Sequence, residues 1–179
     1  MKCTGLSASQ RLALLLENGL QAEASKWKAP VFEGSNLKGT DISPANYEQT
    51  VLWIEELRSL FHFYPETFGL AVSVLNRMLA TVKVQAKYLR CIAVTCLYVA
   101  AKINEEDEVI PSVKNLAVQS GSMCSSAEIL RMERIILDKL QWDLYTATPV
   151  DFLNTVRICS LWKQLVQQDK HIGTPANPK

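Results

Sequence analysis

The side chains that most often carry enzyme chemistry or bind metals are few in this sequence. The chain has five cysteines, none of them in a C-x-x-C pair, and two histidines, His62 and His171. This set does not predict a zinc site with the usual Cys and His spacing. Cys91 and Cys96 lie in an apolar run and are expected to be buried thiols. Such thiols indicate a reducing compartment inside the cell, so we expect the protein in the nucleus, the cytoplasm or both.

Motifs that mark common catalytic sites are missing from the sequence. It contains no G-x-x-x-x-G-K, no G-x-S-x-G, no H-E-x-x-H and no glycine-rich phosphate loop. A catalytic histidine would have to be His62, between two phenylalanines at a helix end, or His171 in a polar segment. No pair of carboxylates is singled out. We therefore expect a protein that is not an enzyme, with no catalytic residues, no cofactor, no metal and no small-molecule ligand.

One carboxylate does lie in an unusual setting, in the stretch LRMERIILDKLQWDL at residues 130–144. With residues spaced about 100° apart around a helix, the apolar side chains of this stretch fill an arc of roughly 160°. Glu133 falls inside that arc, between Leu137 and Leu140. The helix is therefore either wedged between several neighbours or presents part of the arc to another molecule. Because an ionised carboxylate in apolar surface must be paired or lie at its border, Glu133 marks either a boundary between core and interface or an internal salt bridge.

The charge and hydropathy patterns exclude several classes of partner. Nineteen basic and eighteen acidic residues give a net charge of +1, and no region is strongly basic, so nucleic acid is not a predicted partner. The longest nearly apolar stretch, residues 91–101, is far shorter than the roughly 20 residues of a membrane span. The leucine-rich residues 12–16 are too few for a signal-peptide core. We expect a soluble protein with no membrane partner.

Hydrophobic periodicity predicts an all-α chain that forms one ordinary domain. Glycine and proline lie mostly between the periodic segments, and residues 28–44, which hold several of them, are expected to be a linker. We expect helices over residues 9–27, 43–64, 65–82, 87–102, 111–116 and 125–144, and a further helix starting at Thr148 and Pro149.

Three of these segments carry specific signals. The stretch KYLRCIAVTCLYVAAK is apolar nearly all round, which is typical of a helix in the middle of a bundle. Four acids at residues 105–108 follow that helix and would oppose its dipole, so they are expected in a solvated loop. The residues SSAE at 125–128 form a capping-box pattern that starts the next helix.

The chain is expected to divide into three parts. Residues 1–42 form an N-terminal helix and linker, residues 43–153 form the main helical domain, and residues 154–179 form a short C-terminal tail. The polar composition of the tail and its ending, IGTPANPK, predict that it is partly disordered.

Three stretches, in this order, resemble the first cyclin box, a fold of five helices: YPETFGLAVSVLNRMLA, LRCIAVTCLYVAAKINEEDE and SSAEILRMERIILDKLQWDLYTATPVDFL. The resemblance covers about residues 47–153. Within the cyclin family, ILRMERIILDKLQWDL and YPETF are most similar to the cyclin I subfamily, with the cyclin G subfamily next. The resemblance implies a regulatory subunit that docks on a cyclin-dependent protein kinase and repositions its αC helix and activation loop.

The resemblance also implies which residues hold the kinase. In the family, a lysine that ends the third box helix and a glutamate in the fifth contact the kinase, and Lys102 and Glu133 match them. Leu137 and Trp142 match apolar contacts. The residues alone leave another interpretation open, in which Lys102 snorkels at a helix end, Glu133 bridges Lys102 or a nearby arginine, and Leu137 and Trp142 pack in the core.

Three departures from the family pattern limit what is expected. Many cyclins open the first box helix with an M-R-A-I-L-like docking patch, but residues 46–50 are NYEQT here, so substrate recruitment by that patch is not expected. Where the family has an Arg–Asp pair, this chain has Tyr47 and Asn76. Because both charges are lost together, no buried charge is left without a partner. Only residues 154–179 follow the box, so the second cyclin fold is expected to be missing.

We therefore expect a cyclin-like regulatory subunit of a cyclin-dependent protein kinase, acting in the cell cycle or related signalling. The alternative is a single box that competes without activating, or a kinase-independent interaction scaffold. A nucleic-acid-associated protein that shares the fold is disfavoured by the near-neutral charge.

Overall fold

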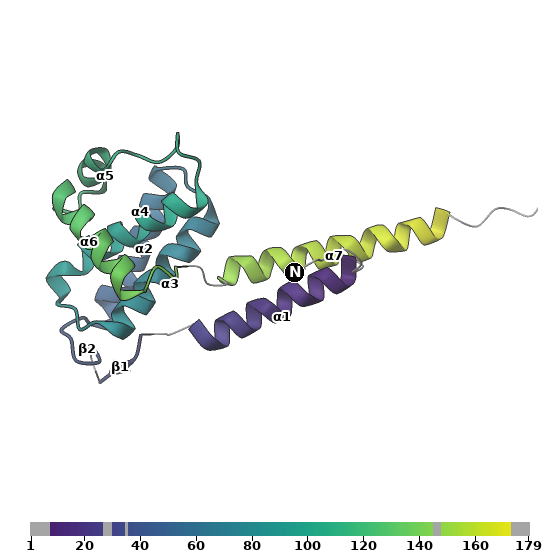
Figure 1. Cartoon of the computed structure of the whole chain (residues 1–179), viewed down its shortest axis with the longest axis horizontal. Helices are drawn as coiled ribbons and strands as arrows, with labels where there is room; N and C mark the ends of the chain where they lie inside the picture. Colours follow the sequence, from purple (N-terminus) through teal and green to yellow (C-terminus); the bar gives the residue numbers. More distant parts are fainter. Residues whose placement is uncertain (1–7, 27–29, 35, 145–147, 173–179) are drawn as a thin grey trace, which may run out of the picture.

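The computed structural model describes residues 8–26, 30–34, 36–144 and 148–172, and within these ranges the chain is all-α apart from one short hairpin, as predicted. The elements are α1 (Ala8–Lys26), β1 (Phe32–Glu33), β2 (Asn36–Leu37), α2 (Pro44–Leu60), α3 (Pro65–Thr81), a 3₁₀ turn (Ala86–Tyr88), α4 (Leu89–Asn104), α5 (Val113–Ser120), α6 (Ser126–Lys139) and α7 (Pro149–Ile172). Helices α2 to α6 form a bundle, and α1 and α7 lie side by side in an arm that extends from it (Figure 1).

Helix α4 is the centre of the bundle. Twelve of its 16 residues are buried, and it packs against α2, α3 and α6. Thr95, a polar residue in its buried middle, donates its hydroxyl hydrogen to the carbonyl of Cys91 at 2.7 Å, so the donor of that hydroxyl is satisfied inside the core. The prediction that this helix lies inside a bundle is confirmed.

Side-chain caps fix where several helices begin. Ser43 accepts a hydrogen bond from the backbone N–H of Asn46, and Pro44 occupies the first turn of α2. The predicted capping box of α6 is present, because Ser125 Oγ accepts from the N–H of Glu128 while the Glu128 carboxylate accepts from the N–H of Ser125. Thr148 makes the same reciprocal pair with Asp151 at the start of α7.

The helix expected at residues 111–116 is displaced along the chain. Helix α5 begins at Val113, because the side chain of Ser112 accepts a hydrogen bond from the N–H of Asn115 and so caps the helix there. It continues to Ser120 and ends at Gly121, whose φ of 60° is in the left-handed region that glycine adopts without strain.

Part of the predicted linker packs on the bundle. Strands β1 and β2 form a two-stranded antiparallel hairpin in which Phe32 is paired with Leu37. The Phe32 ring meets the edge of the Tyr47 ring at a centroid distance of 5.9 Å, and Leu37 and Ile42 are buried in the core. The bundle is therefore sealed on this side by residues that precede position 43.

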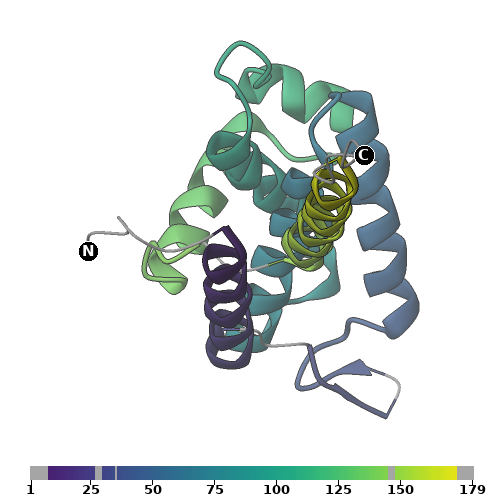
Figure 2. The ribbon, with the colours of Figure 1, turned by 90° about the vertical axis from the view of Figure 1, so that its right-hand side faces the viewer.

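Residues 154–172, which were expected to belong to a partly disordered tail, are included in α7. No glycine or proline interrupts residues 150–172, and several strong helix formers occur among them. The first turn of α7 rests on α3, where a Cβ on Gly69 would come within 3.2 Å of Thr148. Residues 173–179 lie outside the described residues. Figure 2 views α1 and α7 nearly along their length, standing in front of the bundle.

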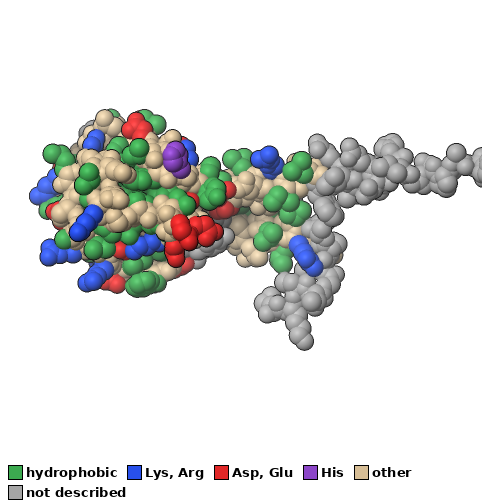
Figure 3. All heavy atoms as spheres, turned by 90° about the horizontal axis from the view of Figure 1, so that it is seen from above, with side chains coloured by type: hydrophobic (Ala, Val, Ile, Leu, Met, Phe, Trp, Pro, Cys, Tyr) green, Lys and Arg blue, Asp and Glu red, His purple; other side chains and the backbone are tan. Residues whose placement is uncertain are grey.

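The arm carries apolar side chains on its surface. The exposed apolar residues of α1 and α7 include Leu15, Leu20, Leu153, Val156 and Leu161. Figure 3 shows hydrophobic side chains on the described part of the arm. Within the described ranges, no helix combines the length and the hydropathy needed to cross a bilayer.

Replacing Leu97 with alanine is expected to lower the free energy of unfolding by about 2–5 kcal/mol, because the fully buried leucine sits in the middle of α4 and would leave a cavity. Leu52→Ala is the matched control, since the Leu52 side chain on α2 is 66% exposed. Its effect should stay below about 0.5 kcal/mol. Urea unfolding curves measure both changes, and similar losses for the two variants would contradict the central position of α4.

Candidate functional site

Lys102 and Glu133, which the sequence singled out, are in direct contact. Lys102 lies in the last turn of α4 and Glu133 lies in the middle of α6, and the two helices pack together. Lys102 Nζ is 2.6 Å from Glu133 Oε1. The structure thus contains the internal salt bridge that the residues alone left open.

The bridge lies at the border between core and solvent. The Lys102 side chain is 41% exposed, whereas the Glu133 side chain is only 13% exposed. Lys102 Nζ also lies 4.5 Å from the centroid of the buried Tyr98 ring, one turn earlier on α4. The ammonium group is therefore held between a carboxylate and an aromatic face, at a helix C-terminus where positive charge is favoured.

The apolar arc of α6 is divided between the core and the surface. Ile129, Ile136 and Leu140 are buried in the bundle, while Leu130 and Ile135 are exposed. One part of the wide arc predicted from the sequence thus packs against neighbouring helices, and another part is exposed.

Leu137 and Trp142 continue the line from Glu133 toward the end of α6. Leu137, four residues after Glu133 and hence on the same side of the helix, is half-buried against the core. Trp142 follows the helix in a tight turn and is 71% exposed, so it is not a core residue. The backbone N–H of Trp142 donates a hydrogen bond to the backbone carbonyl of Leu137 at 2.9 Å. We call Lys102, Glu133, Leu137 and Trp142 the rim strip.

The turn that presents Trp142 is conformationally strained. Gln141 and Trp142 have φ values of 53° and 60°, in the left-handed region that non-glycine residues rarely adopt. Each such residue costs of order 1 kcal/mol or more, so the surrounding structure must hold the turn in place. The result is an aromatic side chain held in solvent on a defined backbone.

Glu105 has a role that the sequence did not predict. The loop at residues 105–110 is present as expected, and the three acids after Glu105 are exposed. Glu105 itself is half-buried, and its Oε1 accepts hydrogen bonds from the Tyr64 N–H at 2.8 Å and from the Thr67 hydroxyl. Helix α3 starts after Tyr64, whose own side chain does not cap it, so a carboxylate from the loop after α4 takes that place. The absence of a capping residue before Pro65 was the signal in the sequence.

A hydrogen bond between Tyr47 and Asn76 stands where the family has an Arg–Asp pair between α2 and α3. The Tyr47 hydroxyl donates to Asn76 Oδ1 at 2.6 Å, and Asn76 is buried. Burial raises the pKa of Tyr47, which keeps the hydroxyl neutral and able to donate. The two helices are joined here by a neutral hydrogen bond.

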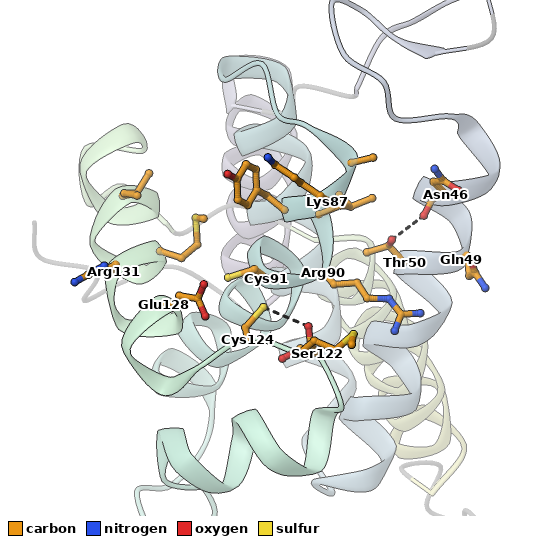
Figure 4. Close-up of a pocket in the computed structure, with 16 residues that line it drawn as sticks. Asn46, Gln49, Thr50, Lys87, Arg90, Cys91, Ser122, Cys124, Glu128 and Arg131 are labelled. Carbon is orange, nitrogen blue, oxygen red and sulfur yellow. Dashed lines mark hydrogen bonds between the residues drawn. The ribbon is translucent and has the colours of Figure 1, made fainter.

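The polar residues that replace the M-R-A-I-L-like stretch line a cavity of about 630 Å³ between α2, α4 and the start of α6 (Figure 4). Asn46, Gln49 and Thr50 form its wall on α2. Arg90 lies over the Trp53 ring, 5.2 Å from the ring centroid. This wall is polar, as the sequence predicted.

Few groups with catalytic or metal-binding potential gather in the described residues. His62 is exposed, and the side chain of His171 lies outside the described part. Cys91 and Cys96 are buried, as predicted, and are free thiols. No group of three or more His, Cys, Asp or Glu side chains lies close enough to hold a metal ion in the part of the chain that was described.

Comparisons with known proteins agree with this fold. The family described as "Cyclin, N-terminal domain" matches residues 20–145. Human Cyclin-I2 is 50% identical over 107 residues, which cover 60% of this chain and 29% of that protein. Human Cyclin-G2 is 42% identical over 125 residues, covering 65% of this chain and 36% of that protein. Mouse Cyclin-G1 is 32% identical over 143 residues, covering 80% and 49%. The chain thus spans less than half the length of these curated relatives.

The solved structures add a likeness in fold. The X-ray structure of a viral cyclin from herpesvirus saimiri matches with a TM-score of 0.64 at 24% sequence identity, covering 87% of this chain and 66% of that one. The resemblance to the first cyclin box is confirmed by these comparisons, and members of the I and G subfamilies are among the similar proteins.

Replacing Glu105 with alanine is expected to lower the free energy of unfolding by about 1–2 kcal/mol, because the N–H of Tyr64 and the buried hydroxyl of Thr67 lose their acceptor. Glu106→Ala is the matched control, since it removes the neighbouring exposed carboxylate. Thermal unfolding monitored by circular dichroism compares the two. Equal melting temperatures would show that Glu105 does not cap α3.

The bridge between Lys102 and Glu133 can be tested by charge exchange. Lys102→Glu and Glu133→Lys should each lower the stability, because each places like charges at the rim. The double exchange should recover most of the loss. Since the lysine side chain is 41% exposed, we expect a coupling energy of only about 0.2–1 kcal/mol. A double variant whose loss equals the sum of the two single losses would contradict the bridge.

Proposed function

This chain belongs to the cyclin family, and from that premise we propose that it is a regulatory protein, not an enzyme, that binds a cyclin-dependent protein kinase through the rim strip. The observation that carries the proposal is the Lys102–Glu133 pair at the boundary between the bundle core and exposed apolar surface.

The charged pair is suited to contact a partner because it is ordered but still accessible. Only one oxygen of Glu133, Oε1, takes part in the bridge, and the Lys102 ammonium group retains exposed surface beside it. A partner's backbone N–H and carbonyl groups could bind these two side chains without breaking their contact. The neighbouring carboxylate and aromatic ring already restrict Lys102, so little further conformational entropy is lost on binding.

Exposed apolar side chains lie near the pair along α4 and along α6 and the turn that follows it. Ile103 follows Lys102 and is exposed, Leu130 lies one turn before Glu133 on α6, and Trp142 projects beyond the helix end. Protein interfaces commonly combine a desolvated charged group with aromatic anchors, and tryptophan is the residue type most enriched among the strongest contacts. The rim strip has this composition.

We also propose which partners are excluded and where the protein is located. We expect no nucleic acid, membrane or small-molecule partner, since the net charge is +1 and the described helices include no membrane span. Location in the nucleus, the cytoplasm or both is supported by the free thiols of Cys91, Cys96 and Cys124. The alternative is a box that binds a kinase without activating it, or an interaction scaffold that binds no kinase.

Lys102→Glu and Glu133→Lys are each expected to weaken kinase binding by roughly 30-fold or more, because losing one member of a desolvated charge pair at an interface costs about 2–5 kcal/mol and reversal adds repulsion. Pull-down with a panel of cyclin-dependent kinases identifies the partner, and titration then gives the affinities. Lys114→Glu, which reverses an exposed charge on α5 that is not part of the rim strip, is the matched control and should bind normally.

The double exchange separates docking from a purely internal bridge. If the pair contacts the kinase, the double variant recovers stability but still binds weakly, because both charges are reversed toward the partner. Normal binding by the double variant, or by either folded single variant, would refute the docking role. A phosphorylation assay on the complex then distinguishes an activating subunit from a non-activating competitor, and the absence of any kinase from the pull-down would favour the scaffold.

A further inference from the structure

Two cysteines from distant parts of the chain meet at the cavity. Cys91 lies in the first turn of α4, and Cys124 lies in the turn between α5 and α6. Both line the cavity of about 630 Å³, and Figure 4 shows their sulfur atoms turned toward the same region. The Cys124 thiol is one of the groups that raise the pKa of Cys91, so folding has brought the two side chains close together at this cavity.

The two thiols differ in reactivity. Burial raises the pKa of Cys91 to about 12, and contact with the Cys124 thiol and the negative charge of Glu128 act in the same direction. Cys91 is therefore protonated and slow to react at neutral pH. Cys124 is only half-buried, and its thiol donates to the Ser122 carbonyl at 3.3 Å. A small oxidant entering from the cavity side thus reaches Cys124 first.

The turn that carries Cys124 has two locally unfavourable features. Met123 has a φ of 58°, a conformation that is costly for a non-glycine residue, and its side chain is 98% exposed. Ser122 is buried, and its hydroxyl has no hydrogen-bond partner among the described residues. Both neighbours of Cys124 therefore contribute unfavourable terms, which lower the cost of moving this turn. A disulfide requires the two sulfur atoms to come to the bonded distance of about 2.05 Å.

We propose that Cys91 and Cys124 form an oxidation site, at which a hydroperoxide converts the two thiols to an intrachain disulfide that ties α4 to the turn before α6. The site differs from Cys96, which lies on the same helix but is fully buried and does not line this cavity. The inference is independent of the proposed kinase binding.

The chemistry balances in two steps with hydrogen peroxide as the oxidant. The Cys124 sulfur attacks one peroxide oxygen, an S–O bond forms and the O–O bond breaks, and the departing hydroxide leaves as water with the thiol proton. The Cys91 sulfur then attacks the Cys124 sulfur, the S–S bond forms and the S–O bond breaks, and a second water carries away the Cys91 proton. Two thiols are oxidised by two electrons and one peroxide is reduced to two waters.

The disulfide would act on the cavity and leave the rim strip in place. Cys91 and Lys102 lie eleven residues apart on α4, which corresponds to roughly 16 Å along the helix axis. The new bond would instead fix the exposed Met123 turn over the cavity wall formed by α2 and α4. Oxidation thus changes the shape of this face, and any ligand of the cavity would bind the two redox states differently.

Treating the full-length protein with hydrogen peroxide tests the proposal. Intact mass should fall by two hydrogen atoms, and peptide mapping without reduction should recover one linked pair that contains Cys91 and Cys124. The oxidised protein should melt several degrees higher than the same sample after reduction, because the bond closes a loop in the unfolded chain. The disulfide should form faster as the pH is raised from 7 to 9, because the thiolate fraction of Cys91 increases.

Three serine variants provide the controls, each checked for its fold by circular dichroism. Cys96→Ser should still form the disulfide. Cys91→Ser should stop at the first step, leaving a sulfenic acid on Cys124 that dimedone traps, and Cys124→Ser should form neither product. The proposal is overturned if wild-type protein yields only intermolecular dimers, a linkage to another cysteine, or Cys124 oxidised beyond the sulfenic acid while Cys91 remains a free thiol.

Discussion

Burial of α4 on every side is the constraint on which the rest of the structure depends. A helix that is apolar nearly all round is stable in water only when neighbours cover each of its faces, and here α2, α3 and α6 do so. Its middle can then carry no exposed polar group. Only its two ends reach the surface, so the cavity forms at the first turn, near Cys91, and the rim strip forms at the last, at Lys102.

The C-terminal end of α4 also sets the positions of two other helices. Lys102 bridges to α6 through Glu133, and Glu105, three residues later, caps α3 through Tyr64 and Thr67. A single turn of chain therefore couples three helices by charged and hydrogen-bonded contacts at the edge of the core. The rim strip takes its geometry from the packed bundle, which is how a binding surface is kept preorganised.

Local signals made much of this structure predictable. The capping box at Ser125, the start at Ser43 and Pro44 and the buried α4 depend on residues close together in sequence, so capping patterns and hydrophobic periodicity predicted them. The cap by Glu105, the meeting of Cys91 with Cys124 and the exposure of Trp142 depend on residues brought together by packing or on a strained turn, which one sequence does not encode locally. The extent of α7 was missed because polar composition describes a solvated helix as well as an irregular tail.

The hydrogen bond between Tyr47 and Asn76 gives the bundle a contact of a different electrical character from the bridge at the rim. Neither partner carries a charge, so dissolved ions do not screen the attraction between α2 and α3. The Lys102–Glu133 pair, in contrast, loses strength as ionic strength rises, because its lysine is open to counterions. Concentrated salt therefore weakens the Lys102–Glu133 ion pair at the rim, while the hydrogen bond between α2 and α3 is kept.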